Sequence, residues 1–113
     1  MTNKDRLSEL TRYLESYKKY RRFMNAARST DAEPPFEYSE VSGMLDSVRT
    51  FVLALPDSTE KLFLYYHYIQ GESMERCSEI LGVALRSMYR IRLRALNLAA
   101  DRFFFGKPIG LAV

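Results

Sequence analysis

Arginine recurs at four-residue intervals toward the end of the chain, at Arg86, Arg90 and Arg94. A rotation of about 100° per residue places these side chains on one side of a helix, where Asn97 continues the same stripe. A guanidinium group can form two hydrogen bonds with the edge of a guanine or hold a phosphate, so the stripe suits the major groove of DNA. A basic face that meets water alone is the alternative, because most runs of charge are solvated. The spacing by itself leaves both interpretations open.

The elements around the stripe favour the first interpretation. An apolar arc lies opposite the arginines: Ala84, Met88, Ile91 and Ala95. If Gly82 is the turn of a two-helix unit, the positions that must face inward are apolar, with Glu79 as the exception: Met74, Cys77, Val83, Met88 and Ile91. This pattern predicts a helix-turn-helix whose second helix, residues 84–99, buries one side and presents its arginines to solvent.

Short motifs flank this turn on both sides. They are Leu55-Pro56-Asp57, then Tyr68-Ile69-Gln70-Gly71 at the end of an aromatic-rich helix, Ser73-Met74-Glu75, Glu79-Ile80-Leu81-Gly82-Val83 and Ser87-Met88-Tyr89-Arg90. Over residues 55–96 their order resembles region 4 of bacterial sigma factors and their phage relatives. The resemblance implies a domain that binds an upstream promoter element in double-stranded DNA and, in sigma factors, also contacts RNA polymerase. Small proteins that join a basic helix to such a unit resemble regulators of late genes in phages and prophages.

The resemblance also indicates which side chains would contact DNA. Arg86 and Ser87 stand at the start of the second helix, where side chains face bases. Arg90 and Arg94 follow as contacts to bases or phosphates, and Tyr89 flanks them. These five residues are the candidate DNA-binding site.

Three residues depart from the family pattern. Ala84 stands where a serine or threonine usually caps the second helix, which should cost about 1 kcal/mol of helix stability. Ser78 stands where alanine is usual. Leu85 takes a position often held by a polar residue that contacts bases.

The beginning of the chain predicts a long amphipathic helix. Residues 3–28 contain no glycine or proline, and Thr2 or Asn3 is the expected cap. Apolar residues follow steps of three and four, interrupted by Arg21: Leu7, Leu10, Leu14, Tyr17 and Met24. This helix either packs on its own domain or pairs with a second copy as a short coiled coil, giving a homodimer. Its many basic side chains either add phosphate contacts or are solvated.

An acidic linker with Pro34 and Pro35 is expected over residues 29–38, because proline cannot continue a helix. The helix-turn-helix domain follows as residues 39–100. It starts with a helix that ends at Pro56 and turns one apolar side inward: Val41, Met44, Leu45, Val48, Phe51, Val52 and Leu55.

The next helix should begin with a capping box formed by Asp57 and Glu60 and close at Gly71. Its side chains are expected to supply much of the core: Leu62, Phe63, Tyr65, Tyr66 and Ile69. The apolar tail, residues 101–113, contains three consecutive phenylalanines, Phe103 to Phe105. We expect them to extend the last helix by a turn and the tail to fold back onto the core or the first helix, since exposed rings are costly; a surface for a partner is the alternative.

Composition limits the classes of function. The patterns above predict a small all-α protein of four to five helices. A chain of 113 residues that is 47% hydrophobic can form a modest core, and its net charge of +3 favours a nucleic acid partner. One cysteine, no signal peptide and no long apolar run predict a soluble cytoplasmic protein without disulfides or membrane contact. His67 and Cys77 are too few for a metal site or a nucleophilic centre, so neither enzymatic activity nor a cofactor is expected.

The sequence therefore predicts a sequence-specific DNA-binding transcription regulator that inserts residues 84–99 into the major groove. A protein-interaction adaptor remains the alternative, because helix-turn-helix units also serve as scaffolds. Such an adaptor would bind RNA polymerase or a phage packaging complex.

Overall fold

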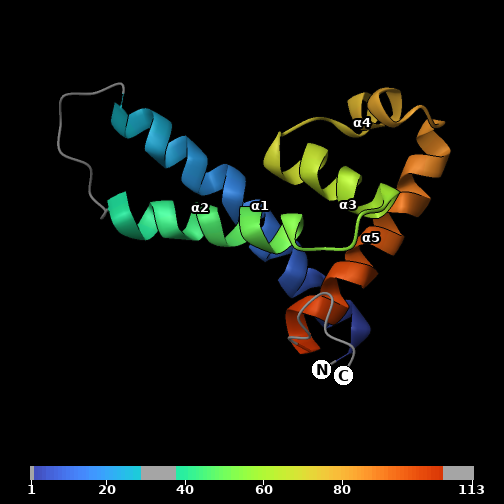
Figure 1. Ribbon diagram of the computed structural model, residues 1–113, viewed down its shortest axis with the longest axis horizontal. Helices are drawn as coiled ribbons and strands as arrows, with labels where there is room; N and C mark the ends of the chain where they lie inside the picture. Colours follow the sequence, from blue (N-terminus) through green and yellow to red (C-terminus); the bar gives the residue numbers. More distant parts are fainter. Residues whose placement is uncertain (1, 29–37, 106–113) are drawn as a thin grey trace.

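A computed structural model describes residues 2–28 and 38–105, which form helices joined by short turns (Figure 1). The elements are α1 (Asn3–Arg28), α2 (Tyr38–Leu53), α3 (Thr59–Leu64), η1 (Tyr65–Ile69), α4 (Met74–Leu81) and α5 (Leu85–Phe105). Residues 2–28 and 38–105 contain no strand, which confirms the all-α class and the expected number of helices. The expected linker, apart from Tyr38, and the tail beyond Phe105 lie outside the described residues.

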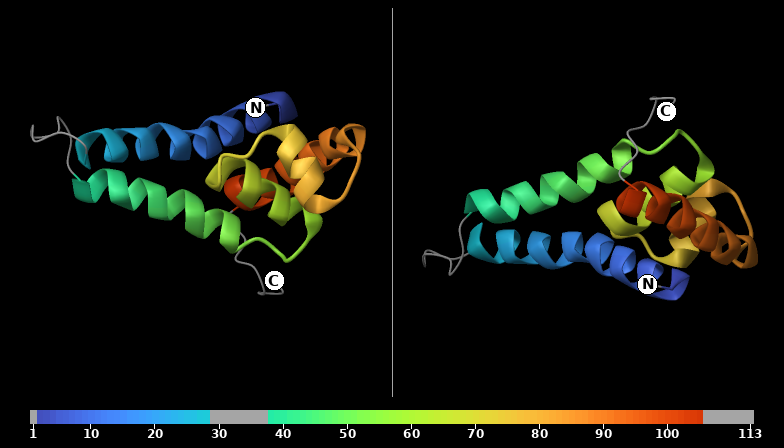
Figure 2. Two further views of the ribbon diagram at one scale, coloured as in Figure 1. Left: turned by 90° about the horizontal axis from the view of Figure 1, so that it is seen from above. Right: turned by 90° about the horizontal axis from the view of Figure 1, so that it is seen from below.

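Helix α1 begins as the sequence predicts. The Asp5 N–H donates to Thr2 Oγ1 (3.2 Å), and Thr2 N–H donates back to Asp5 Oδ2 (3.1 Å), so each residue caps the other. From there α1 runs antiparallel to α2, and the two form a hairpin that projects away from α3, α4 and α5 (Figure 2).

The apolar side of α1 is used within the molecule. Leu10, Leu14 and Tyr17 are buried in a core that also contains residues of α2, η1 and α5. Packing on its own domain, one of the two alternatives that the sequence left open, is therefore present in the fold, and pairing with a second copy stays a prediction.

Aromatic rings join α1, α2 and the end of α5. Tyr13, Phe51 and Phe103 form a cluster in which the ring centroids of Tyr13 and Phe103 lie 4.9 Å apart and those of Phe51 and Phe103 lie 5.8 Å apart. The Arg6 guanidinium covers the Phe105 ring at 5.3 Å. The phenylalanines thus extend α5 and pack against the first helix as expected, and α5 continues to Phe105 rather than ending at residue 99.

Helix α3 does not start with the predicted capping box. Ser58 is the N-cap, and its Oγ accepts from Lys61 N–H (3.2 Å). The cap must immediately precede the first helical residue, and Asp57 lies one position too early. Its carboxylate instead accepts from Lys61 Nζ at 2.8 Å.

A π-helical turn, η1, continues α3 and changes which residues face the core. In a π turn the backbone bond spans five residues, as from Gln70 N–H to the Tyr65 carbonyl (3.0 Å). Residues five apart are buried together as a result, namely Phe63 with Tyr68 and Leu64 with Ile69.

Two residues that were expected in the core are exposed instead: Leu62 on α3 and Met44 on α2. The π turn explains Leu62, since the buried side follows a five-residue step there. On α2 the buried side narrows to Val41, Val48 and Val52, which leaves Met44 outside it.

The turn between α4 and α5 forms as predicted. Gly82 has left-handed backbone angles (φ 68°, ψ 33°), and its N–H donates to the Glu79 carbonyl. Val83 N–H donates to the Ser78 carbonyl at 3.0 Å, which completes a C-terminal capping motif. Cys77 lies fully buried on the inner side of α4.

Candidate nucleic-acid interface

Helix α5 lies along one edge of the molecule, with α3, α4 and α1 on its inner side (Figure 1). That inner side is buried: Met88, Ile91, Ala95, Leu96, Ala99 and Ala100. The spacing of three and four residues between these positions produces an amphipathic helix whose remaining surface faces outward. Whatever α5 presents to a partner must therefore come from its outer side.

Arg86 and Arg90, on the outer side, are both exposed. Neither forms an ion pair or hydrogen bond with another residue of the described segments. They lie one turn apart, as the sequence predicts, and both guanidinium groups are available to an external acceptor.

Arg94 and Arg92 are engaged within the molecule instead. Arg94 Nε lies 3.2 Å from Glu60 Oε1 of α3, so this member of the predicted stripe is an ion-pair partner that fixes α3 against α5. Arg92, which lies off the stripe, is half-buried and lies next to Tyr68. Burial raises the pKa of Tyr68, and the neighbouring Arg92 partly offsets this rise.

The other two predicted site residues differ in exposure. Tyr89 lies on the outer side, while Ser87 is half-buried near the turn. The structure therefore brings Arg86, Tyr89 and Arg90 together on one open surface, with Ser87 beside them and Arg94 tied to α3.

Ala84 occupies the N-cap position of α5, where its carbonyl accepts from Met88 N–H (3.0 Å). Its side chain is exposed, so the expectation that it packs on the inner arc is wrong. The N-cap residue precedes the helix proper and has non-helical backbone angles, so helical periodicity does not fix the direction of its side chain. Without a hydroxyl, Ala84 leaves the first N–H groups of α5 uncapped by its own side chain.

Sequence reasoning named Tyr89 as a site residue but missed that it belongs to a second exposed set on α5. Leu85, Tyr89 and Leu93 are 38%, 55% and 55% exposed, and each immediately precedes an arginine of the basic stripe. We call these three residues the apolar stripe. Their four-residue spacing was visible in the sequence, but that spacing by itself does not distinguish an exposed apolar side from a buried one.

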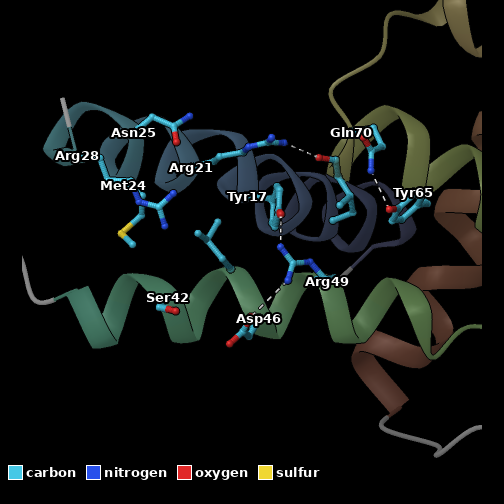
Figure 3. A pocket seen from close by; sticks show the side chains of 12 residues that line it. Tyr17, Arg21, Met24, Asn25, Arg28, Ser42, Asp46, Arg49, Tyr65 and Gln70 are labelled. Carbon is cyan, nitrogen blue, oxygen red and sulfur yellow. Dashed lines mark hydrogen bonds and ion pairs between the residues drawn. The ribbon is translucent and has the colours of Figure 1, made fainter.

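A second group of arginines lines a polar cleft of about 490 Å³ between α1 and α2 (Figure 3). Arg21 and Arg28 enter it from α1, and Arg49 enters it from α2. Arg49 donates to Tyr17 Oη (2.8 Å) and lies 3.7 Å from the carboxylate of Asp46. The bond to Tyr17 raises the pKa of Arg49 above its ordinary value.

Arg21 is also held in place within this arginine cleft, because it donates to the Ile69 carbonyl at 3.3 Å. The cleft thus differs from the surface of α5 in that two of its three guanidinium groups bond to protein acceptors. Sequence analysis gave no sign of it, since it depends on how α1 and α2 meet.

The single histidine and the single cysteine have structural surroundings. His67 stacks on Phe63 with centroids 5.2 Å apart and donates from Nδ1 to the Glu72 carbonyl (2.8 Å). Burial and the nearby Glu72 carboxylate raise the pKa of the Cys77 thiol. Residues 2–28 and 38–105 contain no group of three or more histidine, cysteine or acidic side chains placed to hold a metal ion. Nor do they include a helix long and apolar enough to cross a membrane.

Comparisons with models of known protein families, with curated proteins and with solved structures give no significant match for this chain.

Proposed function

We propose that this protein is a sequence-specific DNA-binding transcription regulator of the sigma-factor region 4 type, encoded by a phage or prophage. Double-stranded DNA is its partner, and α5 is the helix that enters the major groove. The exposure of Arg86 and Arg90 carries the proposal, since both project from the second helix of a helix-turn-helix and lack partners among the described residues. A guanidinium fork matches the two acceptors of a guanine edge and the oxygens of a phosphate.

The surrounding fold supports this role by fixing α5 in position. Met88 and Ile91 are buried beneath the two arginines, and the Gly82 turn sets α4 across the start of α5. A rigid base lowers the entropy lost when the arginines bond to DNA. Arg86 and Arg90 are assigned to bases, with Tyr89 flanking them, Ser87 is assigned to the adjoining backbone, and Arg94 is assigned to orienting α3 through Glu60.

Binding of the full chain to duplex DNA at several salt concentrations tests the proposal. If four to five phosphates are neutralised, the logarithm of the association constant should fall with the logarithm of salt concentration with a slope of about −4. Arg90→Ala should weaken binding to a selected site by roughly 1 to 3 kcal/mol, because a bidentate base contact is lost. Fluorescence anisotropy with a selected and a random duplex measures both quantities.

A matched pair on α1 controls for charge. Arg12 and Arg22 are both exposed there, and Arg12→Ala/Arg22→Ala removes as much charge as Arg86→Ala/Arg90→Ala. The α1 variant should keep the preference for the selected duplex over the random one, since phosphate contacts carry no sequence information. Association that is insensitive to salt would contradict the proposal.

A protein-interaction adaptor is the second candidate, and the apolar stripe is the observation that favours it. Exposed leucines on a helix are a common feature of protein-binding surfaces. RNA polymerase or a phage packaging complex would be the partner. Salt-independent binding to polymerase by a chain that shows no affinity for DNA would favour this function.

A further inference from the structure

The apolar stripe lies beside Arg86 and Arg90 on α5. Leu85 precedes Arg86 and Tyr89 precedes Arg90, so a partner that meets one pair of side chains also meets the other. The larger apolar residues on the inner side of α5, such as Met88 and Ile91, are almost fully buried. The exposure of Leu85 and Tyr89 is thus a property of the outer side and not of α5 as a whole.

Charge decides what kind of partner fits this mixed surface. An apolar protein surface seated on the stripe would also cover Arg86 and Arg90, and burying an unpaired charge is strongly unfavourable. The major groove offers both kinds of contact together, since guanine presents two acceptors there and thymine presents its 5-methyl group. Arginine bonds the first, and an apolar side chain packs against the second.

We propose that Leu85 and Tyr89 are specificity-determining residues that pack against thymine methyl groups in the major groove. This inference rests on the proposed function. Arg86 and Arg90 bond the guanines next to these thymines. The start of α5, from Leu85 to Arg90, spans about 8 Å at 1.5 Å per residue. At about 3.4 Å per base pair this is two to three base pairs, so thymine and guanine lie close together in the site.

Leu93 is not assigned to a base. It lies a further turn along α5, next to Arg94, and Arg94 is tied to Glu60. The thymine contacts are therefore expected from the first two turns of the helix, where Arg86 and Arg90 also lie.

Replacing thymine by deoxyuridine tests the proposal on the unmodified protein. Duplexes are first selected from a random library by the full chain, and each thymine of the selected site is then replaced singly, which removes one methyl group. A buried methyl corresponds to about a fourfold change in affinity. We expect such a loss at one or two thymines and no change at the others.

Protein variants then assign the contact to a side chain. In Leu85→Ala or Tyr89→Ala, one sensitive thymine should become indifferent to deoxyuridine. Leu53→Ala is the matched control, because Leu53 is a comparably exposed leucine at the end of α2. This control should keep the full discrimination at every position. Because the deoxyuridine series needs no variant, the proposal stays testable even if an alanine variant folds poorly.

The outcomes separate this proposal from the proposed function. Selected, salt-dependent binding with no loss at any deoxyuridine would overturn the thymine contacts and leave DNA binding standing. Failure to select any duplex over random sequence would overturn both. Discrimination that survives in both Leu85→Ala and Tyr89→Ala would show that other residues contact the methyl groups, which also overturns the proposal.

Discussion

The arginine cleft and the outer side of α5 use the same side chain in opposite ways. In the cleft, Arg49 bonds to Tyr17 Oη and Arg21 bonds to the Ile69 carbonyl. On α5, Arg86 and Arg90 have no bonding partner among the described residues. The first two guanidinium groups hold helices together, while the last two keep their bonding capacity for an external molecule.

Position on the helix decides which use applies. Arg92 and Arg94 are on α5 as well, yet Arg92 meets Tyr68 and Arg94 meets Glu60. Both lie next to side chains of neighbouring elements, whereas Arg86 and Arg90 lie near the turn that precedes α5 and are exposed. A count of arginines therefore says little about a binding surface until the internal acceptors are known.

Two double variants test whether the two groups of arginines have different roles. The variant on α5 has the largest expected effect. Arg86→Ala/Arg90→Ala should lower affinity for a selected duplex by about 3 kcal/mol, on the order of a hundredfold in Kd, since two base contacts are lost. Its unfolding free energy should stay within about 0.5 kcal/mol of the parent, as is usual for surface changes. Anisotropy and urea denaturation supply the two numbers.

Arg21→Ala/Arg49→Ala should behave in the reverse manner. It removes two bonds that join α1 to η1 and α2. The free energy of unfolding should fall by only about 1 kcal/mol, because both bonds are partly exposed and screened by solvent. Preference for the selected duplex should survive. If both variants lost DNA binding equally, the distinction between internal and external arginines would be wrong.

Glycine gives a second contrast, between the turn that precedes α5 and the interior of α2, with an expected effect of about 1 kcal/mol on stability. Gly82 has a positive φ, and an added Cβ would meet no atom within 4 Å, so Gly82→Ala should destabilise through backbone strain alone by about 1 kcal/mol. Gly43 lies inside α2 with equal open space, so Gly43→Ala should stabilise by roughly 0.5 to 1 kcal/mol. Urea denaturation of both variants should give opposite signs.

Local patterns predicted the helix-turn-helix well. The Gly82 turn, the burial of Cys77 and Met88 and the exposure of Arg86 and Arg90 all follow from spacing within a short stretch of chain. Such features depend on the helical period and on one residue with a special backbone conformation. The helical period and the turn glycine can both be recognised from a short stretch of sequence.

Several features that depend on a neighbouring element were not predicted. The Arg94 pair with Glu60 and the cleft between α1 and α2 each require knowing which helices meet, whereas the exposure of Leu62 follows from the π turn. The π turn had no signal that periodicity could detect, because it changes the period itself. The cap at Ser58 was missed by one residue, which is the usual uncertainty of a helix boundary.

The smallest expected effect concerns Asp57 and Lys61, a third case of a cation that is used internally. The bond from Lys61 lowers the pKa of Asp57 below its ordinary value of 3.8. A carboxyl whose pKa is depressed by folding adds stability above its unfolded pKa and loses it as pH falls through the folded value. Asp57→Asn should therefore flatten the fall in unfolding free energy below about pH 4.

Lys61→Met should flatten the same part of the curve, and the double variant should add nothing further, because both changes remove the same interaction. Urea denaturation between about pH 5 and pH 2 measures this curve, and a full acid-dependent loss in Asp57→Asn would show that the pair does not contribute.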